Sequence, residues 1–184
     1  MKPLLILLIS LALACNNNKK VDGNEATTGA DSTTTANQLQ KEEELQSLTA
    51  YTPEQMETLL PQELAGAKIS DTSSGKATGT AYARGVYSPN DSTTIELSLF
   101  DCGGSEGSGF YKFQFLNMLD AAAATEEEEN KTIDYKGGKA IEHYDANSYR
   151  SSFTYLADRF LVTLESESLD VEGLKKIAGG LKLK

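Results

Sequence analysis

Residues 78–100, TGTAYARGVYSPNDSTTIELSLF, decide the fold class because they contain two strand patterns separated by a turn. In the second pattern the apolar side chains from Ile95 to Leu99 alternate with Glu and Ser, so they share one face. This alternation is typical of a half-buried strand in an antiparallel sheet with one solvated face. The sequence SPND between the patterns is a strong turn signal. Two antiparallel strands are therefore predicted, over 78–87 and 93–100.

Strand and turn patterns also occur later in the chain, and two helix starts can be predicted as well. Apolar alternation on either side of turn residues predicts further hairpins around 137–138 and around 157–158. A capping box from Thr52 to Gln55 predicts the start of one helix. Asp170 precedes an amphipathic stretch and predicts the start of a last helix.

Composition divides the chain into three parts. Residues 1–14 combine one positive charge with a short apolar run, which is typical of a signal peptide. Residues 15–48 are mostly small, polar or charged, so we expect a disordered linker, with a short helix around 37–48 as the alternative. Residues 49–184 predict one α+β domain. We expect an antiparallel sheet of about five to seven strands, packed by two or three helices.

The segment LALAC, which ends at Cys15, resembles the lipobox of bacterial lipoproteins. In that family the cysteine sulfur receives a diacylglycerol, the signal peptide is removed, and the new amino group is acylated, commonly with palmitate. The resemblance implies that Cys15 is the lipidation site and that its lipid is the link to the membrane. Asn16 then implies, by resemblance to enterobacterial sorting, a location in the outer membrane, facing the periplasm or the cell surface.

Charge and cysteine count exclude several kinds of partner and site. Loss of Lys2 with the signal peptide changes the formal charge from −10 to −11, which opposes binding to nucleic acid. Once Cys15 is acylated, Cys102 is the remaining thiol, so neither an internal disulfide nor a zinc site with paired cysteines is expected. Asp101 and Glu106 oppose a reactive thiolate, and we expect Cys102 to be a small buried residue at a strand end. We expect no metal and no cofactor.

Residues 103–107, GGSEG, match the G-x-S-x-G pattern of hydrolases. In those enzymes the pattern follows a buried parallel strand, whereas the strand before this one alternates between polar and apolar residues. A hydrolase would also need His143, the single histidine, as the base for Ser105. His143 lies far along the chain in a predicted hairpin strand. We therefore expect a strand-to-helix turn and keep the serine hydrolase as a disfavoured alternative.

The stretch FYKFQFLNML, residues 110–119, fits either a helix or a strand. We favour a helix because good helix formers follow it. Tyr111 and Phe115 then belong to the main apolar stripe, whereas Phe110 and Phe113 fall outside it. We expect these two phenylalanines to pack in the core on a second side of the helix, and the alternative is that Phe110 and Phe113 contact a hydrophobic ligand or a protein partner.

Two short motifs in 49–184 resemble small bacterial lipoproteins of uncharacterised function: Leu59-Leu60-Pro61 with Leu64 and Gly66, and Arg159–Val162 before the last helix. This resemblance implies an antiparallel sheet. It does not point to any particular activity. We expect a lipid-anchored protein of the bacterial cell envelope that acts as a non-enzymatic binding or interaction module. A carrier of a hydrophobic ligand is the alternative.

Overall fold

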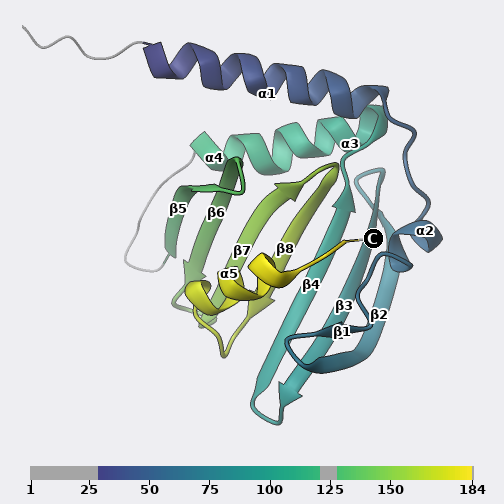
Figure 1. The fold of residues 1–184 in the computed structure, drawn as a ribbon, viewed down its shortest axis with the longest axis vertical. Coiled ribbons are helices and arrows are strands. Elements are labelled where there is room, and N and C mark those ends of the chain that lie inside the picture. The colour runs from purple at the N-terminus through teal and green to yellow at the C-terminus, as the bar shows by residue number, and fades with distance from the viewer. Residues whose placement is uncertain (1–28, 121–127, 184) are drawn as a thin grey trace, which may run out of the picture.

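A computed structural model describes residues 29–120 and 128–183, which form one curled antiparallel sheet with helices on both faces (Figure 1). The strands are β1 Glu63–Leu64, β2 Ala67–Ala77, β3 Thr80–Asn90, β4 Thr93–Asp101, β5 Glu128–Tyr135, β6 Gly138–Asp145, β7 Arg150–Ala157 and β8 Phe160–Ser166. Their order is β1-β2-β3-β4-β8-β7-β6-β5, antiparallel throughout. The predicted α+β class is confirmed, but the sheet has eight strands rather than five to seven.

The helices are α1 Gly29–Ser47, α2 Pro53–Glu57, α3 Gly104–Phe110, η1 Tyr111–Leu116, α4 Asn117–Asp120 and α5 Val171–Gly180. Because α3, the π-helical η1 and α4 follow one another without a break, the described part of 49–184 contains three helical segments, within the two or three expected, and α1 precedes them. No helix within the described ranges is long and apolar enough to cross a membrane.

The predicted hairpins are confirmed, and two of their three turns use residues with positive φ. The β5–β6 turn places Lys136 at φ 49° and Gly137 at φ 81°, and the β7–β8 turn places Asp158 at φ 54°. In the β3–β4 turn the side-chain oxygen of Asn90 accepts a hydrogen bond from the backbone N–H of Ser92, at 3.1 Å. This contact is the local side-chain turn expected of Asn.

Strand β2 was not predicted from the sequence because it lies near the edge of the sheet and is mostly exposed. Polar side chains of β2 form hydrogen bonds with a helix that lies outside the sheet. Thr72 and Ser74 each donate a hydrogen bond to the carboxylate of Glu57 in the α2 helix, both at 3.0 Å. An exposed edge strand needs no apolar alternation, so the pattern that marks β4 is missing here.

Alternating side chains of the sheet belong to two separate cores, one on each face. On β8, Val162 faces the larger core with α2 and α5, and Leu161 faces the smaller core with α1 and η1. The buried residues of the smaller core are Leu45, Cys102, Tyr111, Phe115, Ile141 and Leu161. Cys102 is therefore a buried residue just after a strand end, as predicted.

Helix α1 occupies most of the second half of the expected linker and includes most of the short helix given as the alternative around 37–48, whereas residues 15–28 lie outside the described residues. It covers Gly29–Ser47, and Leu45 is fully buried in the smaller core. Glu42 also forms an ion pair of 3.1 Å with Lys112 of η1. Low average apolarity made the sequence signal of this helix weak, because Leu45 is the one fully buried apolar residue among its described side chains. The signal peptide and Cys15 lie outside the described residues.

Both predicted helix starts are confirmed. Thr52 and Gln55 form the reciprocal capping box of α2, and the Asp170 carboxylate accepts a hydrogen bond of 2.8 Å from the N–H of Gly173 in α5. The regular part of α2 ends at Glu57 rather than at Leu60, before Pro61.

Candidate functional site

The G-x-S-x-G residues form a tight junction between β4 and α3. A side chain at Gly103 would overlap the Arg159 guanidinium, and a Cβ at Gly107 would lie 2.5 Å from the backbone carbon of Cys102. Gly104 has a φ of 79°, a conformation that favours glycine. The glycines are therefore explained by close packing. The predicted strand-to-helix turn is confirmed, and Ser105 is exposed on its first helical turn.

A buried ion pair fixes the same junction. The Asp101 carboxylate accepts hydrogen bonds from Nε and an Nη atom of Arg159 at 2.8 and 3.0 Å. It also accepts hydrogen bonds from the backbone N–H groups of Tyr51 at 2.6 Å and Gly103 at 3.0 Å. Because the Asp101 carboxylate has four donors and Arg159 also binds the carbonyl of Thr49, this pair secures the chain before α2. The polar atoms of Asp101 and Arg159 are therefore occupied by hydrogen bonds within the fold.

The structure does not bring Ser105 and His143 together. Ser105 lies beyond the C-terminal end of β4, whereas His143 on β6 pairs with Ser152, towards the other end of the sheet. From the register, the two ends are separated by about 16 Å along the strand direction alone. His143 Nδ1 instead lies 2.8 Å from the side-chain oxygen of Asn130 on β5.

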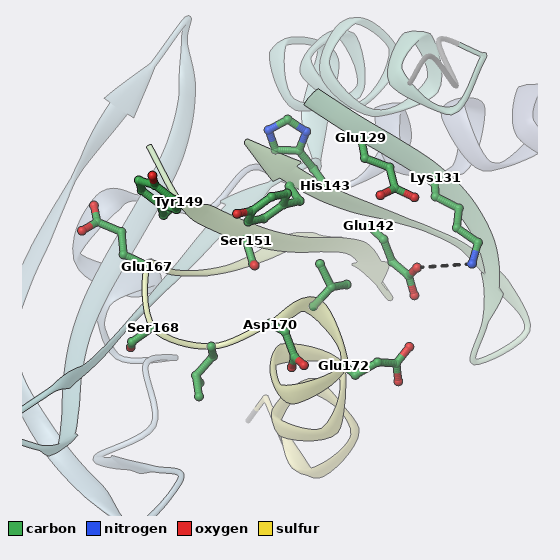
Figure 2. Close-up of a pocket in the computed structure, with 13 residues that line it drawn as sticks. Glu129, Lys131, Glu142, His143, Tyr149, Ser151, Glu167, Ser168, Asp170 and Glu172 are labelled. Atoms are coloured by element: carbon green, nitrogen blue, oxygen red, sulfur yellow. Dashed lines mark ion pairs between the residues drawn. The ribbon is translucent and has the colours of Figure 1, made fainter. Parts of the chain in front are cut away.

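A depression of about 490 Å³ lies where β6 and β7 meet the segment between β8 and α5 (Figure 2). Figure 2 shows its carboxylates spread around the opening rather than converging, with the His143 ring on the far side of its strand from Glu142. Glu142 is paired with Lys175 at 3.0 Å and Lys131 at 3.9 Å. No three His, Cys, Asp or Glu side chains in the described part of the chain are arranged to hold a metal ion. This depression has the features of a solvated acidic surface.

A larger groove, of about 650 Å³, lies between α1, the η1–α4 segment and the turns of two hairpins. Figure 1 shows α1 running beside the α3–α4 segment, above the β5–β6 hairpin. The apolar residues that line the groove are Tyr111, Phe115, Leu119 and Leu156. Its polar lining comes from α1 and from the two hairpin turns, with Asn37, Gln38, Lys41, Asp134, Lys136, Lys139 and Asp158. We call this site the α1–η1 groove.

The π-helix η1 places two aromatic rings in the α1–η1 groove. The N–H of Asn117 bonds to the carbonyl of Lys112, which gives the wide turn of a π-helix. Tyr111 and Phe115 are buried and their rings stack with centroids 5.7 Å apart. Short π-helical turns are frequent at functional sites because they change which side chains a helix presents.

The phenylalanines singled out from the sequence do not line this groove. Phe110 packs against Phe100 of β4, with ring centroids 4.9 Å apart, and Phe113 points to solvent with 70% exposure. The helix favoured for this stretch is confirmed, but it begins at Gly104 and passes through η1. Tyr111 and Phe115 were assigned to the core stripe. Both residues do belong to the core, and both also line the groove. A helical period of 3.6 residues in the sequence does not reveal this second role.

The hydroxyl of Tyr111 is a polar group without a partner in an otherwise buried side chain. Tyr111 is 4% exposed, and its hydroxyl makes no hydrogen bond with any described residue. Burial raises the pKa of Tyr111 to about 12, with the thiol of Cys102 and the carboxylate of Glu42 adding to the rise. The phenol is therefore protonated at neutral pH and offers a hydrogen-bond donor at the groove. Among the described residues the fully buried oxygens without a partner are those of Thr80 and Tyr135, so the Tyr111 hydroxyl reaches the surface of the groove, where a ligand oxygen can accept its hydrogen bond.

The charged groups around the groove include three lysines and two aspartates, in a chain whose formal charge is −10. Lys139 pairs with Asp134 at 2.7 Å, and Lys41 pairs with Glu44 at 3.0 Å. Both ion pairs are partly exposed to solvent, so each contributes little to stability and either lysine can bind another anion instead. The Lys136 ammonium donates a 3.0 Å hydrogen bond to the carbonyl of Ala178 in α5 and lies over two tyrosine rings.

Comparison of the chain with protein-family models, with curated proteins and with solved structures gives no match in any of the three.

Proposed function

We propose that this protein is a lipid-anchored binding module of the bacterial cell envelope, without enzymatic activity, and that the α1–η1 groove binds an apolar small molecule. The apolar lining of the groove, from Tyr111, Phe115, Leu119 and Leu156, is the observation that carries the proposal. The volume of about 650 Å³ lies within the range of about 300–1,000 Å³ that is typical of small-molecule sites. An apolar lining with a few placed polar groups is also typical of such sites.

The proposed anchor is the lipid on Cys15, in the outer membrane and facing the periplasm or the cell surface. Support comes from the lipobox-like segment that ends at Cys15 and from the polar residues that follow it. Several acyl chains on one cysteine give stable attachment, because each buried methylene contributes about 0.8 kcal/mol. The net negative charge of the chain opposes binding to nucleic acid. The alternative of an envelope carrier would use the same groove and add release of the ligand to an acceptor.

Substitution of the proposed lipidation site tests the anchor. Cys15→Ser is expected to move the protein from the membrane fraction to the soluble fraction after cell fractionation. Cys102→Ser is the matched control, because Cys102 is buried and is expected to leave membrane attachment unchanged. Continued membrane attachment of the Cys15→Ser chain would contradict the proposal.

A neutral fluorescent probe tests the groove. The Cys15→Ser chain is expected to bind N-phenyl-1-naphthylamine with increased fluorescence, because apolar side chains line the groove. Leu156→Gln is expected to weaken this binding. Leu181→Gln is the control, since Leu181 is also partly buried but packs on the larger core with α5. No binding, or an equal loss in both variants, would reject the groove as the site.

A further inference from the structure

We propose that the α1–η1 groove selects an anionic amphiphile, a long-chain fatty carboxylate, with its acyl chain on Phe115, Leu119 and Leu156 and its carboxylate at Tyr111 and Lys41. This inference rests on the proposed function of the groove and names its ligand class. An acyl chain suits the apolar lining, and the polar groups beside that lining decide which head group it accepts.

Tyr111 contributes a hydrogen-bond donor to the lining of the groove. Tyr111 is 96% buried, and its hydroxyl makes no hydrogen bond with a described residue. A pKa of about 12 keeps its proton at neutral pH. A ligand oxygen can accept a hydrogen bond from this hydroxyl in place of water, and a charged acceptor forms a stronger hydrogen bond than a neutral one.

Helix α1 contributes a cation, Lys41, to the lining of the groove. Lys41 and Tyr111 both interact electrostatically with Cys102, which places the three side chains in one neighbourhood of the smaller core. The ion pair of Lys41 with Glu44 joins two positions one helical turn apart at the protein surface, so it is weak. A carboxylate in the groove can therefore share the Lys41 ammonium without breaking a buried contact.

The acidic groups near the groove are neutralised or lie at its outer edge. Glu42 faces Tyr111 but is paired with Lys112 at 3.1 Å. Asp134 is paired with Lys139 and its side chain is 88% exposed. Asp158 lines the groove at the β7–β8 turn, and Lys136 lines it at the β5–β6 turn. The described groups beside the apolar floor thus favour an anion over a cation.

The test compares three ligands that share one dodecyl chain: dodecanoate, dodecanol and dodecyltrimethylammonium. Each is titrated below its micellar concentration into the full-length Cys15→Ser chain, by displacement of N-phenyl-1-naphthylamine and by calorimetry. The expected order of affinity is dodecanoate, then dodecanol, then the cation. Tyr111→Phe removes only the hydroxyl and is expected to weaken dodecanoate binding by about tenfold, the effect of one hydrogen bond to a charged group.

Tyr135→Phe is the matched control. Tyr135 is a second tyrosine whose hydroxyl makes no hydrogen bond with a described residue, and its ring packs on the larger core against Phe153 and Tyr155. This variant is expected to bind dodecanoate as the parent does. Lys41→Met is expected to weaken dodecanoate severalfold and to leave dodecanol unchanged, because only the carboxylate carries charge.

Two outcomes would overturn the inference and remain distinct from failure of the proposed function. If the naphthylamine probe binds but dodecanoate binds no tighter than dodecanol, the groove is an apolar site without anion selectivity. If Tyr111→Phe and Tyr135→Phe bind dodecanoate equally, the Tyr111 hydroxyl does not hold the head group. If neither probe nor dodecanoate binds, the proposed function fails as well.

Discussion

Asp101 is a fully buried carboxylate whose charge is balanced by Arg159. Removing one member of a buried pair leaves the other as an uncompensated charge, which is far more destabilising than breaking a surface pair. The guanidinium also lies over the Tyr51 ring, with its carbon 4.4 Å from the ring centroid. The pair therefore acts at the point where three parts of the chain meet: the segment before α2, the end of β4 and the β7–β8 turn.

Arg159→Met is expected to lower the free energy of unfolding by about 3–5 kcal/mol, because Asp101 then stays buried without its cation. Urea denaturation at neutral pH measures the change. Lys139→Met is the control: its ion pair with Asp134 is as short, 2.7 Å, but it is exposed, and its loss is expected to cost less than about 1 kcal/mol. Similar losses in the two variants would contradict a structural role for the buried pair.

Two glycines in α3 differ in what surrounds them. A Cβ at Gly107 meets the backbone of Asp101 and Cys102 at 2.6 and 2.5 Å, whereas a Cβ at Gly109 meets nothing within 4 Å. Gly107→Ala is expected to destabilise the protein by about 2 kcal/mol or more, because backbone cannot move aside as a flexible side chain can. Gly109→Ala is expected to stabilise it by about 0.5–1 kcal/mol through helix propensity. Thermal unfolding of both variants checks the opposite signs, and destabilisation by both would contradict the packing explanation.

At the scale of elements, α1 is polar over most of its length and gains order from tertiary contacts. Leu45 is fully buried against the smaller core, and Glu42 pairs with Lys112 of η1. Isolated helices of this length are marginal in water, so packing of this one face decides whether α1 forms. Since α1 also provides one wall of the groove, its packing and the proposed binding function are linked.

Leu45→Ala is expected to lower the free energy of unfolding by about 2–4 kcal/mol, since it leaves a cavity in a closed core. Leu39→Ala, on the same helix, is the control, because Leu39 is 54% exposed and is expected to change stability by less than about 0.5 kcal/mol. Urea denaturation of both variants is the measurement. Equal stability of the two would indicate that α1 does not pack on the sheet in solution.

Sequence patterns predicted elements wherever apolar periodicity or a cap was present. The β3–β4 hairpin, the capping box at Thr52 and the N-cap at Asp170 all follow from local residues. Strand β2 did not, because an exposed edge strand carries little apolar signal. The π-helical turn of η1 did not either, because its register depends on how Tyr111 and Phe115 meet the sheet.

At the scale of the whole molecule, two cores on opposite faces of one sheet bury several groups in their protonated form. Burial raises the pKa of Cys102 from 9.0 to about 12 and the pKa values of Tyr87, Tyr111 and Tyr155 from 10.0 to about 12. At a pH between the ordinary and the raised pKa values, these thiol and phenol groups have lost their protons in the unfolded chain but keep them in the folded chain. Raising the pH therefore favours unfolding, and the stability that is present below pH 9 is lost as the pH approaches 12.

Urea midpoints measured from pH 8 to pH 11 are expected to be level up to about pH 9 and then to fall. Cys102 alone is expected to contribute a loss of about 3 kcal/mol by pH 11. Cys102→Ala is the control: it removes one titrating group and is expected to make the alkaline decline shallower. A level profile across this range, or one unaffected by Cys102→Ala, would contradict burial of the thiol.

The candidate site shows where prediction from the sequence ends. Phe110 and Phe113 were chosen because they fall outside a helical stripe, but a stripe says nothing about what lies opposite it. Phe110 meets Phe100, and Phe113 meets solvent. The groove residues come from α1, η1 and two hairpin turns, so their proximity is a property of the assembled sheet.

The sequence by itself determined the antiparallel α+β class, the hairpins and the helix caps, because these depend on interactions between residues close together in the chain. Tertiary structure alone decided that GGSEG is a packing junction, that Ser105 and His143 are far apart, and that Tyr111 faces a groove with an unpartnered hydroxyl. Those properties depend on contacts between residues that are remote in the chain. Local periodicity carries no information about such contacts until the sheet is assembled.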